Sequence, residues 1–379
     1  MATFGDIAKG FDYGMNAAAK SFDGNNKYIR ITDIDEVSSQ YLYDDVVSPD
    51  GELEDRYLVK ENDILLARTG ASTGKSYLYR NSDGKLYFAG FLIRANIYKH
   101  NSYFVFSQLH TLRYKKWISV MSARSGQPGI NSQEYASFPV YTTSLQEEDK
   151  IATFLKLLDE RIITQNKIIE DLKKLKSAIS KHLFARKDLL ETTICLSNIA
   201  TLKNGYAFQS GKYNALGKWK ILTITNVSGE RYINDEDYNC IINLPNDIQD
   251  HQVLKEGDIL ISLTGNVGRV SLCKDGDYLL NQRVGLLQLA KNVNQEFLYQ
   301  ILSSQRFENS MIACGQGAAQ MNIGKGDVES YVLPYSSNVN NILLVAKILH
   351  SYDEYIINEQ RKLTLLTMQK QYFLAQMFI

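Results

Sequence analysis

The segment RTGASTGKS, residues 68–76, carries side chains that could hold a phosphate group. A nucleotide-binding loop has the pattern G-x-x-x-x-G-K-[ST], because its backbone N–H groups wrap the phosphates before a helix begins. Here Gly70 and Gly74 enclose only three residues. A fourth spacer would put Thr69 where the loop needs the conformational freedom of glycine. An ATP site is therefore disfavoured, and the remaining sequence is needed to identify the role of this segment.

Other patterns for catalysis or metal binding are missing from the sequence. The five histidines form no H-x-x-x-H pair, and the four cysteines lie too far apart for a CxxC metal knuckle. There is no G-x-S-x-G elbow and no Asn-Pro-Pro-aromatic loop of the kind that amino-methyltransferases use. We therefore expect no metal, no cofactor and no catalysis by this chain alone.

Length and composition are those of a globular protein. The chain has 379 residues, of which 44% are hydrophobic and 22% are charged. No apolar run approaches the roughly 18 residues of a membrane span, and the start of the chain does not resemble a signal peptide. We expect a cytoplasmic protein with no membrane partner.

Charge is balanced over the chain but not along it. Lysine plus arginine equals aspartate plus glutamate at 42 each. Residues 1–63 nevertheless hold six basic and fourteen acidic residues, whereas residues 75–124 hold nine basic and one acidic. Such a polarised surface would steer a polyanion; the alternative is a set of unrelated solvated charges.

The chain contains an internal repeat, whose longest match has an offset of 195 residues that becomes 194 after one deletion. The segment ENDILLARTGASTGKSYLY (61–79) matches EGDILISLTGNVGRVSLC (256–273). Three shorter pairs keep the same order: FGDIA (4–8) with LSNIA (196–200), IRITDI (29–34) with LTITNV (222–227), and GQPGIN (126–131) with GAAQMN (317–322). One module is therefore used twice.

Each copy ends on a long heptad pattern, at 145–184 and 339–378, without proline. Eight of ten a and d positions are apolar in each copy, and the polar ones occupy the same slots: Gln165 and Lys176, then Glu359 and Lys370. This period of 3.5 predicts coiled-coil helices about 55 Å long. A core-facing helix is the alternative. The apolar seam comprises Ile151, Leu155, Leu158, Ile162, Ile169, Leu172, Ile179, Leu183, Val345, Leu349, Tyr352, Ile356, Leu363, Leu366, Phe373 and Met377.

The segments before these helices mix short β-branched and aromatic runs with Gly, Asn and Asp turns, and each includes a helical pattern. This mixture predicts α+β modules. The resulting domain boundaries are 1–144 for the first module, 145–185 for the first long helix, 186–338 for the second module and 339–379 for the second helix.

The repeat also tests the opening loop. The second copy, SLTGNVGRV, has Arg269 and Val270 in place of the lysine and hydroxyl, and one residue fewer between the glycines. The shared pattern is a strand, Thr-Gly, a short turn, Gly, a basic residue and another strand. We therefore interpret RTGASTGKS as a tight turn that holds one cation, Lys75 or Arg269.

This order of features closely resembles the specificity subunit of type I restriction-modification enzymes. The features that carry the resemblance are the DILLARTGASTGKS and DILISLTGNVGRV turns, AGFLIR (89–94) opposite NQRVG (281–285), the GQPGIN and GAAQMN blocks, and the helix openings IATFLKLLDERI and VAKILHSYDEYI. The resemblance implies two tandem pseudo-repeated globular α/β target recognition domains, separated by two long helices that form an antiparallel coiled coil.

The resemblance also implies the partners. Each domain is expected to read one half of a split target in double-stranded DNA, while the coiled coil spaces the domains and docks two modification (methyltransferase) subunits. Restriction subunits, which are ATP-dependent translocases and nucleases, complete such a complex. Methyl transfer to adenine N6 and cleavage then belong to the partners. The alternatives are a non-catalytic coiled-coil scaffold that binds proteins and a self-contained enzyme, including the ATPase.

Candidate DNA-binding residues follow from their chemistry. Lys and Arg bind phosphates, while Arg, Asn, Gln, Ser and Thr can read base edges. The candidates are Arg68, Ser72, Thr73, Lys75, Arg94, Lys115, Lys116, Arg124 and Gln127 in the first half, and Asn266, Arg269, Gln282, Arg283, Gln316, Gln320 and Lys325 in the second. Arg94 has a structural alternative as an ion-pair member in an apolar strand. Because NQRVG replaces AGFLIR, we expect two different half-sites.

Overall fold

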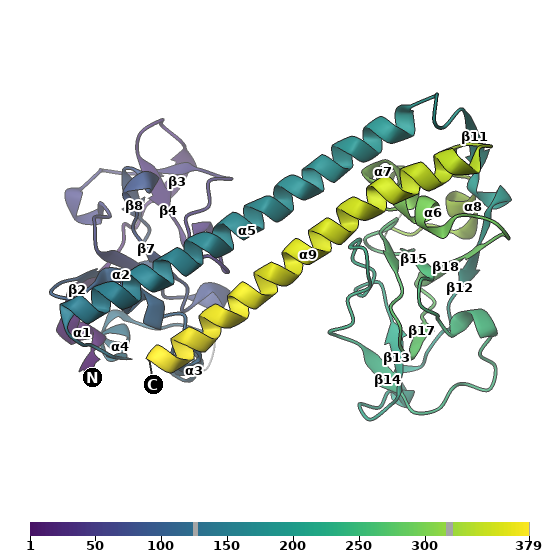
Figure 1. Cartoon of the computed structure of the whole chain (residues 1–379). Coiled ribbons are helices and arrows are strands. Elements are labelled where there is room, and N and C mark those ends of the chain that lie inside the picture. The colour runs from purple at the N-terminus through teal and green to yellow at the C-terminus, as the bar shows by residue number, and fades with distance from the viewer. Residues whose placement is uncertain (124–127, 316–320, 379) are drawn as a thin grey trace. The chain divides into compact units, whose positions relative to one another are not determined.

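A computed structural model of the chain describes residues 1–123, 128–315 and 321–378 (Figure 1). The chain divides into two compact units: unit 1 comprises Met1–Lys167 and Arg361–Ile379, and unit 2 comprises Ile168–Gln360. The two long helices are α5 (Leu145–Ala185) and α9 (Val339–Met377). Each unit therefore contains one globular module and a portion of both long helices.

Unit 1 is built on a four-stranded antiparallel sheet. Its strand order is β2 (Ala8–Tyr13), β9 (Leu92–Ile97), β6 (Asp63–Ala67), β7 (Ser76–Leu78). Smaller pairs are β4 (Lys27–Ile29) parallel to β8 (Leu86–Phe88), β3 (Ala18–Ser21) with β5 (Val47–Asp50), and β1 (Ala2–Thr3) with β10 (Pro139–Val140). The helices of the module are α1 (Phe4–Ile7), α2 (Ser102–Gln108), α3 (Leu112–Met121) and α4 (Ser132–Ala136).

Unit 2 repeats this plan. Its main sheet has the order β12 (Ala200–Asn204), β18 (Val284–Leu289), β15 (Ile259–Ser262), β16 (Val270–Leu272). The other strands are β13 (Trp219–Leu222) between β14 (Asn239–Ile241) and β17 (Tyr278–Leu280), and β11 (Thr192–Cys195) with β19 (Val332–Tyr335). Its shorter helices are α6 (Gln295–Leu302), α7 (Gln305–Cys314) and α8 (Lys325–Glu329). The shared strand order confirms that one fold is used twice.

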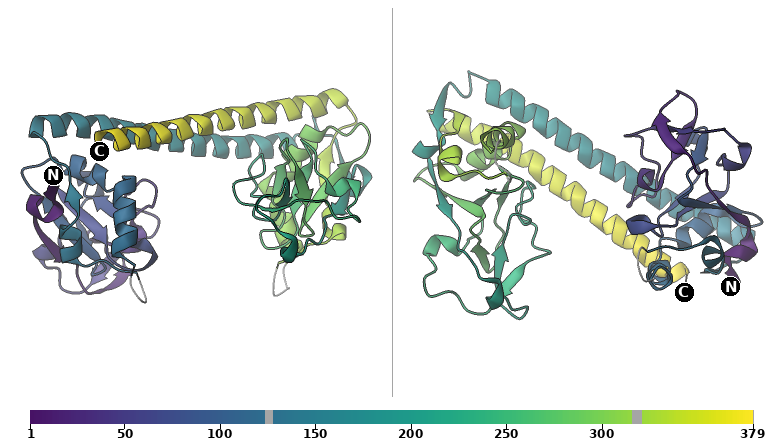
Figure 2. Two further views of the ribbon diagram at one scale, coloured as in Figure 1. Left: turned by 90° about the horizontal axis from the view of Figure 1, so that it is seen from below. Right: turned by 180° about the vertical axis from the view of Figure 1, so that it is seen from behind.

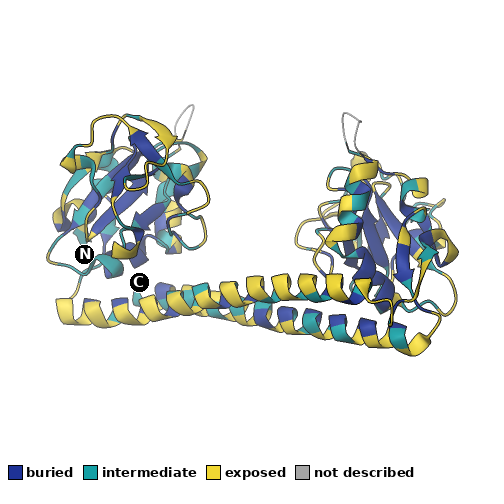
Figure 3. Ribbon diagram, turned by 90° about the horizontal axis from the view of Figure 1, so that it is seen from above, coloured by how far each residue is buried: buried dark blue, intermediate teal, exposed yellow. Residues whose placement is uncertain are grey.

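Strand β6 explains why the DILLA run lacks a polar alternation. All five of its residues are buried, because the sheet is covered on both faces (Figure 3). Ile64 and Leu66 belong to the core that includes α2 and α3, while Leu65 and Ala67 belong to a second core with β4 and β8. The central strand is therefore apolar on both sides.

The long helices pair in opposite directions within each unit. In unit 1, Leu155 of α5 shares a core with Leu374 and Phe378 of α9. In unit 2, Leu183 of α5 shares a core with Val345 of α9. The early part of one helix thus meets the late part of the other, which confirms the predicted antiparallel coiled coil. None of the predicted apolar seam residues is exposed.

Two predicted polar slots of the seam hold equivalent ion pairs. Lys370 Nζ lies 2.6 Å from Asp159 Oδ1 in unit 1, and Lys176 Nζ lies 2.5 Å from Asp353 Oδ1 in unit 2. In each helix the aspartate precedes the lysine by 17 residues. Both pairs therefore specify the same antiparallel register, which is the best-attested role of polar residues in a coiled-coil seam.

Within the described residues, no helix is long and apolar enough to cross a membrane. In the same ranges, no group of three or more His, Cys, Asp or Glu side chains is placed to hold a metal ion.

Candidate nucleic-acid interface

The main sheet of unit 1 has two ends with different neighbours. At one end, the segment after β9 contacts α5: His100 Nδ1 lies 2.8 Å from Glu148 Oε1, and Asn101 Nδ2 donates to Asp149 Oδ1 at 2.8 Å. In the left view of Figure 2, α5 runs along that side of the unit 1 module. The opposite end, here called the distal end, carries the end of β2, the β6–β7 turn and the turn before β9.

The β6–β7 turn is the RTGASTGKS segment. Four of its backbone N–H groups, those of Gly70, Thr73, Gly74 and Lys75, donate to protein carbonyl oxygens at 3.0 to 3.1 Å. These donors are therefore not free to wrap a phosphate, and a strand rather than a helix follows the turn. This geometry agrees with the interpretation of the segment as a turn.

The equivalent turn of unit 2 is one residue shorter but keeps both glycine conformations. Gly70 and Gly265 have φ values of +68° and +69°, and Gly74 and Gly268 have φ values of +92° and +79°. A Cβ atom on Gly74 would lie 2.9 Å from Ile118 Cγ2 of α3, and one on Gly268 would lie 2.6 Å from Met311 Cβ of α7. The second glycine is therefore required twice over, by its positive φ and by the helix packed against it.

Several predicted residues of the first half meet at the distal end of unit 1. The Arg68 guanidinium lies 4.9 Å from the centroid of the Tyr13 ring. The hydrogen bond from Ser132 and the nearby Arg68 cation lower the pKa of the Tyr13 hydroxyl. Lys75 Nζ forms a long ion pair with Glu36, at 3.8 Å.

The two hydroxyl residues of the turn differ in how they are used. The Thr73 hydroxyl donates to the Gly70 carbonyl at 2.8 Å and so closes the turn. Ser72, which is partly exposed, lies next to it in the same turn. Ser72 is therefore the freer of the two for a base or phosphate contact.

The distal end of unit 2 presents a different set. Asn266, Gln282 and Arg283 are exposed. Arg269 Nε lies 3.5 Å from Glu308 Oε1, so this cation, like Lys75, has a nearby carboxylate. Both turn cations would have to exchange or share these carboxylates to contact DNA.

Arg94 does not lie at the distal end. Its guanidinium reaches Asp12 at 2.7 Å and Asp63 at 4.0 Å, and it covers the ring of Phe88. Only 15% of its side chain is exposed. This arrangement favours the structural alternative for Arg94 over a DNA contact, because its guanidinium already donates to Asp12 and to the Leu58 carbonyl.

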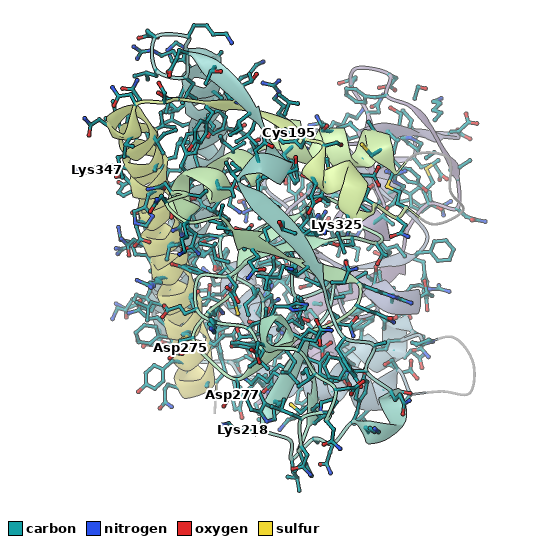
Figure 4. The ribbon with its side chains drawn as sticks, turned by 90° about the vertical axis from the view of Figure 1, so that its right-hand side faces the viewer. Cys195, Lys218, Asp275, Asp277, Lys325 and Lys347 are labelled. Carbon is teal, nitrogen blue, oxygen red and sulfur yellow. The ribbon has the colours of Figure 1, made fainter. Side chains whose placement is uncertain are left out.

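The remaining predicted residues are spread over the modules. Lys115 and Lys116 are exposed on α3. Lys325 opens α8, shown in Figure 4, where its Nζ lies 3.7 Å from Glu329. Four candidates, Arg124, Gln127, Gln316 and Gln320, lie outside the described residues.

The charge asymmetry of the first half is partly cancelled in space. Lys75 and Arg94 of the basic segment form ion pairs with Glu36, Asp12 and Asp63 of the acidic segment. Sequence counts therefore overstate the polarity of the unit 1 surface. The exposed Lys115 and Lys116 remain as basic residues available to a polyanion.

Sequence reasoning missed the aromatic residues of the distal ends. Tyr13 and Phe91 have 41% and 58% of their surface exposed in unit 1. In unit 2, Tyr206 packs against Phe208 with ring centroids 4.8 Å apart, and its hydroxyl donates to Asp247. The sequence did contain a signal for Phe91. An alignment of AGFLIR with NQRVG without gaps places Phe91 opposite Arg283, which was itself a candidate DNA-binding residue.

Comparisons with known proteins agree with this repeated architecture. Residues 4–174 and 191–368 each match the family described as Type I restriction modification DNA specificity domain. The chain belongs to this family. It is therefore a DNA specificity subunit of a type I restriction-modification system and is not itself an enzyme, as the resemblance implied.

Individual relatives support the same conclusion. The chain is 26% identical, over 304 residues, to the type I restriction enzyme MjaVIII specificity subunit of Methanocaldococcus jannaschii, which covers 73% of this chain and 69% of that protein. The fold resembles the crystal structure of the type I restriction-modification system S subunit from M. genitalium, with a TM-score of 0.61 and 16% identity, covering 100% of this chain and 95% of that one.

A further solved structure has the same fold. It is described as the structural basis underlying complex assembly and conformational transition of the type I R-M system, and one of its chains matches with a TM-score of 0.54 and 13% identity. The match covers 98% of each chain. Because these identities are low, the two structures show only that this chain shares their fold.

Proposed function

We propose that the distal ends of the two units contact double-stranded DNA, and that each unit reads one half of a split target. The observation that supports this is that the two distal ends have similar turn backbones but different exposed side chains. The two β-turns share two glycines with similar positive φ angles and the backbone hydrogen bonds that these glycines donate, whereas the exposed side chains around them differ. A constant scaffold with variable side chains is what two different half-sites require.

The coiled coil has the second role in this proposal. Helices α5 and α9 space the two modules and dock two modification subunits, and restriction subunits join them in the cytoplasm. Exposed apolar residues on the outer faces of the helices, among them Leu157, Leu365 and Met368, provide surface for partner helices. The matched Lys–Asp pairs support a fixed register, which a spacer of constant length needs.

Methylation-aware sequencing tests the proposal directly. DNA from cells that express the chain with its modification subunit should carry N6-methyladenine within one bipartite motif, whose two halves differ and enclose unread base pairs. A palindromic motif or an uninterrupted one would contradict the assignment of one half-site to each unit. An absence of methylation, with the subunits assembled, would contradict DNA recognition itself.

Charge reversal on α3 tests the phosphate contacts. Lys115→Glu and Lys116→Glu should weaken binding of the assembled complex to all DNA sequences. Each lost contact should reduce the slope of log K against log salt by about 0.9. Lys347→Glu is the matched control, since Lys347 is exposed on α9 and extends away from the sheets of unit 2 (Figure 4). Equal effects of all three substitutions would remove Lys115 and Lys116 from the interface.

The spacing role can be tested by lengthening both helices. One heptad inserted between Asp159 and Lys176, and one between Asp353 and Lys370, keeps the two ion pairs in register. Seven residues add about 10 Å of helix, which corresponds to about three base pairs of B-DNA. The gap in the methylated motif should grow accordingly. An unchanged gap in an assembled, active complex would show that the coiled coil does not set the spacing.

A further inference from the structure

Two positions at the distal end are joined by one backbone hydrogen bond in each unit. In unit 1, Arg68 N donates to Phe91 O at 3.1 Å; in unit 2, Leu263 N donates to Arg283 O at 3.1 Å. The first position of each pair follows the central strand, β6 or β15, and the second precedes β9 or β18. Arg68 is thus the structural equivalent of Leu263, and Phe91 is the equivalent of Arg283.

The two pairs contain the same chemistry in opposite places. Each consists of one arginine and one apolar residue, but the arginine follows the central strand in unit 1, whereas in unit 2 it precedes the neighbouring strand. The surroundings of the first position differ in the same way between the two units. Arg68 is held over the Tyr13 ring, whereas Leu263 is buried with 6% of its surface exposed.

The exposed member of each pair has no role in the fold that the described residues reveal. Phe91 has 58% of its surface exposed, and burying an aromatic ring is strongly favourable, so leaving it in water carries a cost. Arg283 is exposed as well, and no ion pair to it occurs within the described residues. Both side chains extend from turns whose backbone is fixed by hydrogen bonds on either side.

We propose that Phe91 and Arg283 are specificity-determining residues that contact base edges at equivalent places in the two half-sites. Phe91 offers an apolar surface without hydrogen-bonding groups, which suits the 5-methyl group of thymine. Arg283 offers two parallel donors, which suit the O6 and N7 acceptors of guanine. One framework position therefore selects an A·T pair in one half-site and a G·C pair in the other. This inference rests on the proposed function.

Base analogues in defined duplexes test the two contacts separately. The bipartite motif is first mapped by methylation-aware sequencing, and binding of the complex with its modification subunit is then measured on synthetic duplexes. Replacing one thymine by deoxyuridine removes only its methyl group. At one position of one half-site this change should weaken binding about fourfold, the value of a buried methylene-sized contact. In the Phe91→Ala complex the same replacement should have no effect.

The second arm uses 7-deazaguanine, which lacks the N7 acceptor. Replacing one guanine of the other half-site should lower the affinity of the complex for the duplex about tenfold, as expected when a bidentate arginine loses one hydrogen bond. Arg283→Ala should abolish that sensitivity, and Arg283→Lys should restore only part of it. Phe91→Leu, which keeps an apolar side chain, should retain sensitivity to deoxyuridine.

The outcomes separate this inference from the proposed function. If the complex methylates a bipartite motif but Phe91→Ala and Arg283→Ala leave every analogue sensitivity unchanged, the two residues do not read bases. A half-site of unit 1 without any A·T pair, or equal losses of affinity for all sequences in Phe91→Ala, would overturn the assignment of Phe91. Absence of a bipartite motif would instead refute the proposed function. Circular dichroism of both variants should match the parent, because the substituted side chains are exposed.

Discussion

Equivalent ion pairs join α5 to α9 in unit 1 and in unit 2, but the side chains around the two pairs differ. In unit 2, Asp353 accepts hydrogen bonds from Lys176 of α5, from Arg231 and from Gln300 of α6. Arg231 in turn binds Glu296 of α6 at 2.6 Å. Although burial opposes it, the Arg231 cation lowers the pKa of the Glu296 carboxyl. The helices and the module of unit 2 thus share one buried polar network.

Unit 1 has a simpler arrangement at the same place. Asp159 of α5 accepts from Lys370 of α9 and from the Tyr103 hydroxyl of α2, at 2.7 Å for the latter. Tyr103 occupies the place that Glu296 has in unit 2, since both are the second residue after the Asn cap of their helix. The duplicated fold therefore preserves the pair that fixes the register and has diversified the contact between module and helices. Register is a property of the coiled coil, whereas attachment is a property of each module.

Removing the two aspartates should separate these roles, with the largest effect in unit 2. Asp353→Ala leaves the partly buried Lys176 and the buried Arg231 without a shared carboxylate, and we expect a loss of about 4 kcal/mol in the free energy of unfolding. Asp159→Ala should cost about 1 to 2 kcal/mol, because the aspartate is 21% exposed and Tyr103 can turn to water.

The two tryptophans allow this comparison in the full chain. Trp117 lies in α3 of unit 1 and Trp219 lies in β13 of unit 2, and the sequence has no others. Denaturant unfolding followed by each tryptophan, in variants that replace the other by phenylalanine, reports on one unit at a time. Asp171→Ala is the matched control, since its pair with Lys174 is exposed and 4.0 Å long. Equal losses for Asp159 and Asp353 would contradict the difference in attachment.

The second comparison concerns the turn glycines. Alanine at either position has to adopt a positive φ, which costs about 1 to 2 kcal/mol, and has to displace a helix side chain, which costs about 1 to 3 kcal/mol. We expect Gly268→Ala to destabilise unit 2 by about 3 to 4 kcal/mol. Gly74→Ala should destabilise unit 1 by somewhat less, because its nearest contact is 2.9 Å rather than 2.6 Å. Thermal unfolding of the two variants measures the difference.

A control isolates the backbone contribution to these losses. Gly24 has a φ of +88°, and a Cβ atom on it would meet nothing within 4 Å. Gly24→Ala should therefore cost only about 1 kcal/mol. If Gly74→Ala and Gly268→Ala cost no more than this control, packing of α3 and α7 against the turns contributes nothing to the conserved shape of the distal ends.

The outcome of sequence reasoning differed between local and distant features. The long helices and their polar slots follow from periodicity, which is a local property, and the structure has them. The partners of charged residues do not follow from spacing. Arg94 lies 82 residues from Asp12, and Arg231 lies 122 residues from Asp353. Only the fold brings these side chains together, so residue type alone left both a DNA contact and an ion pair open for Arg94.

At the distal ends, the sequence predicted the turns but not the exposed aromatic residue. The repeat identified the turns that form them, because glycine and Thr-Gly patterns mark a fixed backbone. Phe91 was overlooked because an aromatic residue beside a strand is usually buried, and only its exposure in the structure distinguishes it. An exposed apolar residue such as Phe91, which breaks a folding rule, is thus hard to find by a search that rests on folding rules.

The smallest expected difference between the units is a pH dependence that comes from His110. This histidine lies two residues after the end of α2, with Nδ1 3.0 Å from Phe106 O and Nε2 3.0 Å from Ser39 Oγ, while Ser303 is its counterpart after α6 in unit 2. Burial, helped by the nearby Lys370 cation, lowers the pKa of His110 to about 4. Lys115 acts in the same direction, and Asp159 opposes it.

Because the folded pKa of His110 lies below the ordinary value of about 6.5, the unfolded chain binds more protons between these two values. The stability that the neutral ring contributes is therefore complete above about pH 6.5 and is lost as pH falls toward 4. Between pH 7 and pH 5, unit 1 should lose about 2 kcal/mol through this residue. In the Trp219→Phe background, Trp117 fluorescence should record that loss in the parent chain and not after His110→Gln. If the loss of stability persists in His110→Gln, another group of unit 1 is responsible. If Trp219 fluorescence records the loss and Trp117 fluorescence does not, unit 2 is the pH-dependent unit, which is the reverse of what His110 and Ser303 predict.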